Sequence, residues 1–125
     1  MNGKRYLLDT NAIIALLQND INLRQLLGDA EWIGISVISQ IEFLAFPNLT
    51  EADLKIFQQF VQRIEVVDLC SEDNLVIEQI IVIRQQYRLK LPDAIITATA
   101  IQRSAKLITR DVQLNRVIEL TVLSW

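Results

Sequence analysis

Four acidic side chains in this sequence share the same kind of local context. Each stands just past a predicted strand or in the first turns of a predicted helix. In parallel α/β sheets the carboxyl ends of the strands meet at one edge, and such folds hold their ligands there. We therefore expect these acids to converge at one edge of one sheet. They are Asp9, Glu42, Asp93 and Asp111.

Carboxylates brought together in this way would need a cation. Two carboxylates about 4 Å apart repel each other by about 4 kcal/mol at an effective dielectric constant of about 20, so a cluster would otherwise protonate or spread apart. The sequence contains no histidine and a single cysteine, Cys70, and all-oxygen ligation favours Mg²⁺ or Mn²⁺ over zinc or copper. Such an ion polarises a phosphate and lowers the pKa of bound water, which predicts phosphodiester hydrolysis.

Each acid also has a simpler structural interpretation, and the sequence alone leaves both open. Glu42 lies three residues after Ser39, which fits a capping box in which the glutamate bonds back to the N–H of the cap residue. Asp93 could be a first-turn acid favoured by the helix dipole, and so could Asp9. Asp111 could be an ordinary turn or cap residue.

Composition excludes some classes of function and leaves others open. The absence of histidine excludes a histidine general base and a Ser/His/Asp triad. A single Cys70 cannot form an internal disulfide, so a reducing cytoplasm is the expected location. Asp9 interrupts the first apolar run, which makes a poor signal peptide, and no apolar run approaches the roughly 20 residues of a membrane-spanning helix. The net charge is −3, and without the four acids 12 basic residues face 11 acidic ones, so charge neither supports nor excludes a nucleic-acid partner.

Strand-like and helix-like segments alternate along the 125 residues. This alternation predicts right-handed crossovers and a parallel sheet with helices on both faces. We therefore expect an α/β fold, a three-layer α/β/α sandwich with a parallel five-stranded sheet, in one domain over residues 1–125. The expected strands are 4–8, 32–37, 64–69, 106–109 and 120–124. The expected helices are 10–18, 23–27, 39–46, one that follows Thr50, one that follows Ser71 and runs to Tyr87, and 91–103.

Polar residues before the apolar runs predict where the helices begin. The expected capping residues are Thr10 or Asn11, Asn22, Ser39, Thr50 and Ser71. Helical spacing predicts which apolar side chains are buried. The expected stripes include Leu54, Phe57, Phe60 and Val61 after Thr50, and Ile77, Ile80, Ile81 and Ile83 after Ser71.

The motifs that carry the four acids resemble, in order and spacing, those of the PIN-domain ribonucleases. The closest subgroup is the VapC-type toxins of bacterial toxin–antitoxin pairs. The matching motifs are LLDTN at 7–11, a looser serine-to-glutamate motif at 36–42, LPDA-x-I-x-A at 91–98 and LITRD at 107–111. The resemblance covers essentially the whole chain. It implies a compact α/β/α sandwich with the first strand central, a nuclease site dependent on Mg²⁺ or Mn²⁺, and single-stranded or structured RNA as the substrate.

By position, the resemblance transfers the family's catalytic and metal-ligating quartet to Asp9, Glu42, Asp93 and Asp111. Asn11 matches the polar residue that hydrogen-bonds within the site in relatives, and Thr109 is a second supporting polar residue. Many relatives carry a further acid two residues after the last one, followed by Phe. Gln113 and Leu114 occupy those positions here, so Asp111 must serve alone. The resemblance also implies a small antitoxin protein as partner and a homodimer.

Basic side chains flank the expected site and could position RNA through its phosphates, although solvated surface charges are the simpler interpretation. They are Arg84, Arg88, Lys90 and Arg110. Two other folds that place acids at strand ends fit poorly. A receiver domain needs adjacent acids early in the chain, and a haloacid-dehalogenase-type phosphatase needs D-x-D where this chain has Asn11. The remaining alternative is a PIN fold retained as an RNA- or protein-binding module with little or no nuclease activity.

Overall fold

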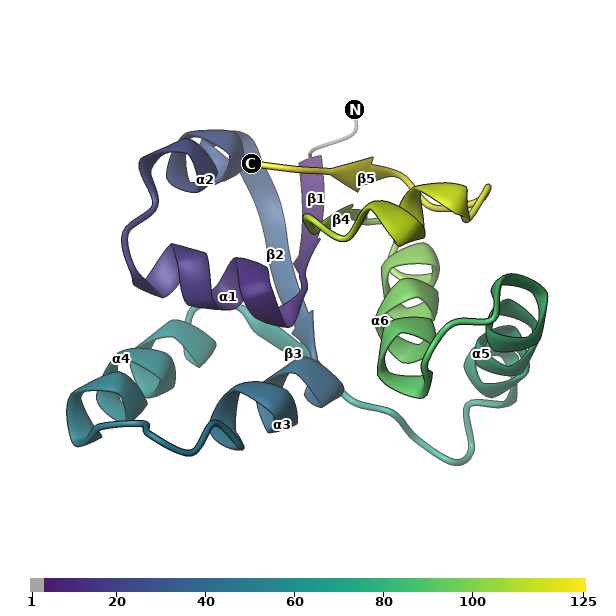
Figure 1. Cartoon of the computed structure of the whole chain (residues 1–125), viewed down its shortest axis with the longest axis horizontal. Helices are drawn as coiled ribbons and strands as arrows, with labels where there is room; N and C mark the ends of the chain where they lie inside the picture. Colours follow the sequence, from purple (N-terminus) through teal and green to yellow (C-terminus); the bar gives the residue numbers. More distant parts are fainter. Residues whose placement is uncertain (1–3) are drawn as a thin grey trace.

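The computed structural model describes residues 4–125 and contains one parallel five-stranded sheet (Figure 1). The first three residues of the expected domain lie outside the described residues. The strand order is β3-β2-β1-β4-β5, so the first strand is central, as the resemblance implied. The strands are β1 (Lys4–Leu8), β2 (Ala30–Ser36), β3 (Glu65–Val67), β4 (Lys106–Ile108) and β5 (Val122–Leu123).

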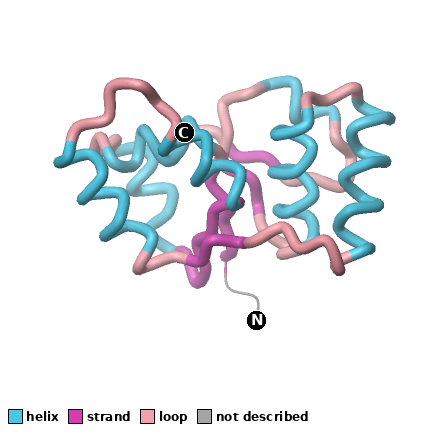
Figure 2. The backbone as a smooth tube through the Cα atoms, turned by 90° about the horizontal axis from the view of Figure 1, so that it is seen from below, coloured by secondary structure: helices cyan, strands magenta, loops and turns pink. Residues whose placement is uncertain are grey.

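Helices cover both faces of this sheet, and the strands run between them in Figure 2. On one face lie α1 (Thr10–Leu17), α2 (Ile21–Leu26), α3 (Val37–Leu44) and α4 (Glu51–Val61). On the other lie α5 (Asn74–Tyr87) and α6 (Leu91–Gln102). Two short 3-10 helices, η1 (Leu27–Asp29) and η2 (Val112–Arg116), complete the chain. The expected three-layer sandwich is therefore confirmed. No helix among the described residues is long and apolar enough to cross a membrane.

The central strand aligns the ends of its neighbours. Leu8, the last residue of β1, pairs with Ile35 of β2 on one side and with Ile108 of β4 on the other. Leu7 packs against the α5/α6 layer, whereas Leu8 packs against the α1–α4 layer, and both are fully buried. Because all strands are parallel, the residues that follow β1 and β4 emerge at the same edge of the sheet.

Helix α6 lies close to the sheet because its side chains are small. Ala94, Ala98 and Ala100 are fully buried, and Thr97 is buried with them. This helix begins at Leu91, with Pro92 in its first turn, where the missing proline N–H costs no hydrogen bond. Its first turn, which carries Asp93, is thereby placed near the strand ends.

Several helices are capped by a different residue from the one expected. The capping side chains are Asp9 for α1, Asp20 for α2, Ser36 for α3 and Asp73 for α5, in place of Thr10 or Asn11, Asn22, Ser39 and Ser71. Thr50 does cap α4, in a capping box with Asp53. Two expected core positions were also wrong, since Ile81 is 49% exposed and Leu54 is 37% exposed.

Candidate active site

One cavity of ≈ 500 Å³ at the carboxyl edge of the sheet brings the four expected acids together. They reach it from four places: the end of β1, the helix α3, the first turn of α6 and the segment after β4. The lining is Asp9, Thr10, Asn11, Glu42, Ala45, Phe46, Asp93, Ile96, Asp111 and Leu114. Thr109 does not line the cavity, but it is buried between β4 and Asp111.

Asp9 is fixed by both its backbone and its side chain. Its N–H donates to the carbonyl of Ile108 at 3.2 Å, which ties it to β4. Its Oδ1 accepts the N–H of Ala12 at 2.7 Å, so this carboxylate is itself the N-cap of α1. Asp9 is therefore both the N-cap of α1 and a residue that lines the acidic cavity.

Glu42 does not take part in a capping box. Ser36 caps α3 by accepting the N–H of Ile38 at 3.1 Å, and Ser39 is buried inside the helix with no hydrogen-bond partner for its hydroxyl. Instead, the Thr10 hydroxyl donates to Oε1 of Glu42 at 2.6 Å. This bond joins the start of α1 to the second turn of α3 and holds the carboxylate at the cavity wall.

Asp111 lies next to a polar turn. Its N–H donates to Oγ1 of Thr109 at 3.0 Å, and its Oδ1 accepts the N–H of Gln113 at 3.0 Å, so it caps η2. Gln113, which stands where many relatives carry a further acid, thus supports Asp111 through its backbone. Asp93 makes no capping hydrogen bond, because Lys90 holds the N-cap position of α6.

The carboxylates in this cavity repel one another. Burial is the main cause that raises the pKa of Asp93 above its ordinary value, and the charges of Asp111 and Glu42 raise it further, against Lys90, which lowers it. For Asp9, too, burial is the largest of the causes that raise the pKa above its ordinary value. Hydrogen bonds from Thr109 and Ala12 oppose that rise, while the charges of Asp111 and Asp93 add to it. A bound cation would relieve this repulsion.

The donor set fits a hard divalent cation. The cavity presents carboxylate, hydroxyl and amide oxygens and no nitrogen or sulfur ligand of histidine or cysteine, which is the chemistry that Mg²⁺ and Mn²⁺ prefer. Within residues 4–125, no three acids stand close enough together to hold one ion directly as they are placed.

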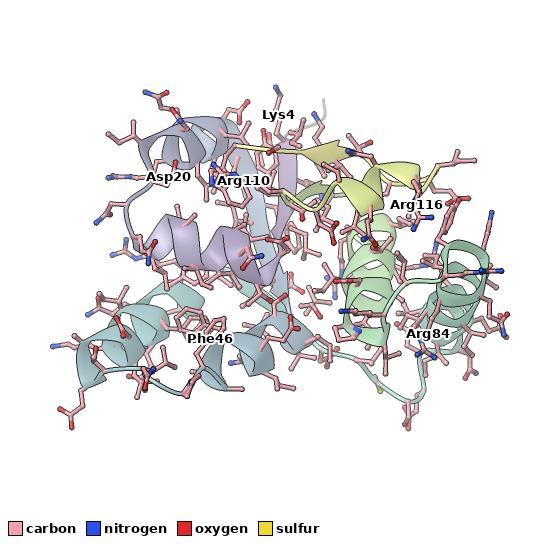
Figure 3. All side chains as sticks on the ribbon, in the orientation of Figure 1. Lys4, Asp20, Phe46, Arg84, Arg110 and Arg116 are labelled. Carbon is pink, nitrogen blue, oxygen red and sulfur yellow. The ribbon has the colours of Figure 1, made fainter. Side chains whose placement is uncertain are left out.

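The four basic residues expected to flank the site lie outside the acidic cavity. Arg84 and Arg88 line a separate hollow between α5 and the start of α6, and Lys90 is near enough to Asp93 to lower its pKa. Arg110 is engaged elsewhere: its Nε and Nη2 donate to the carbonyl of Trp125 at 3.1 and 2.9 Å, and its guanidinium lies 4.3 Å from the centre of the Trp125 ring. Figure 3 shows Arg84 near the lower end of α6 and Arg110 beside the α1 and α2 layer.

Two lining residues had no role in the sequence-based site. Thr10 was expected only as a cap, and Phe46 as the end of a helix whose apolar side chains form the core, a groove for a partner or a dimer face. The signal for Thr10 was its position between Asp9 and Asn11 in the LLDTN motif. Phe46 carried no signal, because its place at the cavity depends on how α3 packs against the sheet.

Comparison with known proteins agrees with this architecture. The family model described as the PIN domain matches residues 6–120. A toxin–antitoxin complex from Klebsiella pneumoniae contains a chain similar to this one with a TM-score of 0.78 at 27% identity, over 94% of this chain and 95% of that chain. A DNA-bound VapBC from Salmonella typhimurium gives 0.78 at 23% identity over 98% of both chains. VapBC2 from Rickettsia felis, bound to a promoter DNA fragment, gives 0.76 at 22% identity over 97% and 98%. No curated protein matches the chain significantly.

Proposed function

Because this chain belongs to the PIN-domain family, we propose that it is a metal-dependent endoribonuclease that hydrolyses RNA phosphodiester bonds as the toxin of a toxin–antitoxin pair. The observation that carries the proposal is the convergence of four carboxylates from four separate elements on one cavity. Mutual repulsion among them is a cost to the fold unless a cation offsets it. The solved complexes to which the chain is similar are toxin–antitoxin assemblies, which supports the biological context.

The residues that would hold the ion are Asp9, Glu42, Asp93 and Asp111, and Mg²⁺ or Mn²⁺ is the cofactor that their chemistry fits. When bound, such an ion polarises the phosphate and lowers the pKa of a water ligand. Thr10 orients Glu42 through its hydroxyl, and Thr109 supports the backbone of Asp111. Ile96 and Leu114 form apolar parts of the wall and exclude water from the side of the reacting phosphate. Asn11, at the exposed mouth, can donate its amide to a phosphate oxygen.

Substrate and partners follow from the surroundings of the cavity. Arg84, Arg88 and Lys90 lie on the α5/α6 side, where they would contact RNA phosphates, whereas Arg110 would first have to leave Trp125.

The partner is a small antitoxin protein. A homodimer is supported by exposed apolar side chains on α5, including Leu75 at 73% and Val82 at 54% exposure. An exposed free Cys70 supports a cytoplasmic location.

The alternative is a PIN-fold module that binds RNA or protein with little or no nuclease activity. The observation that favours it is the spacing of the acids, no three of which stand close enough in the described residues to ligate one ion directly. Both functions use the same fold, so only turnover separates them.

A cleavage assay tests the proposal. The substrate is a 5′-labelled single-stranded RNA of mixed sequence, incubated with the protein in Mg²⁺, in Mn²⁺ and in EDTA. Wild type should cleave only with metal, and Glu42→Gln should lose at least about 100-fold in rate, since the charge that the cation needs is gone. Glu31→Gln, an exposed acid at the start of β2, is the matched control and should retain full activity.

Thermal unfolding in the same metals gives the second measurement. An ion that binds only the folded state stabilises it by RT ln(1 + [L]/Kd), about 2.7 kcal/mol at a hundredfold excess over Kd, and Glu42→Gln should blunt that shift. Cleavage that survives EDTA, or an active Glu42→Gln protein, would contradict the nuclease assignment. A normal metal shift without any cleavage would contradict turnover and favour the binding module.

A further inference from the structure

Phe46 separates two cavities that lie side by side. It lines the acidic cavity together with Glu42 and Asp93, and it also lines a second pocket of ≈ 370 Å³ between α1, α3 and α4. Its side chain is 41% exposed, so one surface of the ring is open to a ligand. Figure 3 shows Phe46 among these three helices. Any chain held in the acidic cavity passes this ring on its way to the second pocket.

The aromatic ring is held in place by other rings. Phe46 meets Phe43 edge-on, with ring centres 6.1 Å apart and planes 78° apart. Phe43 in turn stacks on Phe57 at 4.4 Å and 13°. Both supporting rings are buried. Phe46 is therefore a platform that rests on a buried aromatic ring and leaves part of its own surface open.

The second pocket has the composition of a site for a flat, uncharged, polar-edged ring. Its lining is Ile14, Leu17, Gln18, Phe43, Phe46, Pro47, Asn48, Leu49, Asp53 and Ile56. The apolar members suit the faces of a nucleobase, and the amides of Gln18 and Asn48 can donate to or accept from its edges. Among the described lining residues of this pocket and of the acidic cavity there is no Lys or Arg, so the pocket suits a base better than a phosphate.

An RNA strand cut in the acidic cavity must leave it on two sides. On one side lie Arg84 and Lys90, near the N-terminus of α6, and on the other side lies Phe46. Figure 3 shows Arg84 in the α5/α6 layer and Phe46 among the helices of the other layer. The two exits thus offer different chemistry: cations for phosphates and an aromatic platform for bases.

We propose that the pocket behind Phe46, which we call the base pocket, binds the unpaired nucleobase of a nucleotide next to the scissile phosphate, stacked on the Phe46 ring. This inference rests on the proposed ribonuclease function and adds a substrate requirement to it. A base in a duplex is covered by its stacking neighbours and by its pairing partner, so it cannot turn into the pocket. The base pocket therefore selects single-stranded or looped RNA.

The test combines protein and substrate changes. The cleavage site of wild type is first mapped on a single-stranded RNA oligonucleotide, and each flanking nucleotide is then replaced by an abasic one. Removal of the platform in Phe46→Ala should lower kcat/KM roughly 5- to 150-fold, as for the loss of one base–aromatic stack, whereas Phe46→Trp should retain activity. One abasic position should produce the same loss in wild type and no additional loss in Phe46→Ala, because both changes remove the same contact.

A binding measurement keeps the inference independent of turnover. In EDTA, an oligonucleotide with 2-aminopurine at that position should change its fluorescence on binding to wild type and to Phe46→Trp but not to Phe46→Ala. Ile118→Ala, which removes an 84% exposed side chain elsewhere, is the control and should behave as wild type in both assays.

The outcomes separate this inference from the proposed function. A wild type without metal-dependent cleavage would overturn the nuclease and with it the base pocket. A metal-dependent wild type whose rate is unchanged by Phe46→Ala and by every flanking abasic site would overturn the base pocket alone. The pocket would then be a surface for a protein segment. In that case Phe46→Ala should lose binding to a peptide or protein, which a binding assay measures.

Discussion

The carboxylate of Asp9 serves the fold and the proposed chemistry at once. One oxygen caps α1 through the N–H of Ala12, while the charge of the group contributes to repulsion with Asp93 and Asp111. These two contributions can be separated, because asparagine also caps helices well but carries no charge. The residue therefore allows a clean comparison between an uncharged cap and no cap.

Without metal, Asp9→Asn should unfold with an unchanged or higher free energy, since the cap is kept and the repulsion is removed. Asp9→Ala should lose about 1 kcal/mol, because the N–H of Ala12 loses its acceptor. Both variants should be inactive on RNA. Urea unfolding followed by circular dichroism in EDTA measures the two stabilities. Equal destabilisation of the two variants would show that the negative charge itself is needed at the helix start.

Thr10 is the residue whose role depends most on tertiary structure. Its hydroxyl donates to Glu42 at 2.6 Å, and hydrogen bonds to charged groups contribute about 1.5 to 3 kcal/mol. Thr10→Val, which keeps the shape, should therefore lower RNA cleavage by about tenfold or more, and Thr10→Ser should restore it. Single-turnover cleavage rates measure the effect. If Thr10→Ser is as impaired as Thr10→Val, the methyl group and not the hydroxyl is what matters.

At the scale of single residues, the sequence predicted which side chains could do chemistry but not how they are held. Acids at the ends of apolar runs are visible in the printed sequence, and the four expected ones do line one cavity. The bond between Thr10 and Glu42 spans 32 positions and exists only because α1 and α3 pack together. The alternative bond from Glu42 to Ser39 looked equally good in sequence, and the structure contradicts it.

At the scale of elements, the residue that caps α3 lies three positions earlier than expected, at Ser36 instead of Ser39. Ser36 and Ser39 both precede apolar residues, so either could cap a helix. The sheet decides between them: Ser36 is the last residue of β2 and pairs with Val67, and the chain turns into α3 immediately after it. The capping residues of α1, α2 and α5 were mispredicted for the same reason, because candidate capping residues stand within a few positions of one another before these helices.

The two serines should respond in opposite ways to alanine. Ser36→Ala removes the acceptor for the N–H of Ile38 and should cost about 1 kcal/mol. Ser39→Ala removes a buried hydroxyl without a partner and should leave stability unchanged or raise it by up to about 1 kcal/mol. Chemical denaturation of both variants measures the difference. The reverse order of stabilities would mean that Ser39 caps the helix in solution.

At the scale of the whole molecule, the stability of the fold depends on pH through acids whose pKa the fold raises and acids whose pKa it lowers. The fold raises the pKa of Asp93 from an ordinary value of 3.8, through burial and then the charges of Asp111 and Glu42. It lowers the pKa of Asp29, through the hydrogen bond from Tyr6 and then the contact with Lys4. A raised folded pKa means that the folded state binds more protons than the unfolded chain. The contribution of Asp93 to the free energy of unfolding is therefore fully present below pH 3.8 and is lost as pH rises through its folded pKa.

It follows that Asp93→Asn should gain stability relative to wild type as pH rises from about 4 to 7 in EDTA, because the penalty of the ionised group is removed. Asp29→Asn is the control of opposite sign. Because the folded pKa of Asp29 is lowered, its ionised carboxylate stabilises the fold above the unfolded pKa, and this stabilisation is lost as pH falls through the folded pKa. Asp29→Asn should therefore lose stability relative to wild type as pH rises toward 7. Urea unfolding at several pH values measures both differences. A difference for Asp93→Asn that does not change with pH would show that the fold does not raise the pKa of Asp93.

The pairing of β1 with β4 joins Leu8 to Ile108, and this imposes an order in time on the site. Ribosomes add about 5 to 20 residues per second, so Asp93 and Asp111 are made several seconds after Asp9 and Glu42. Until β4 is released and pairs beside β1, the nascent chain has half of the acidic cavity and no second wall. For the proposed ribonuclease, this order means that no nascent chain carries the complete set of acids until β4 and the segment after it have left the ribosome. The central position of the first strand thus makes completion of the acidic cavity wait for β4, which is one of the last strands to be synthesised.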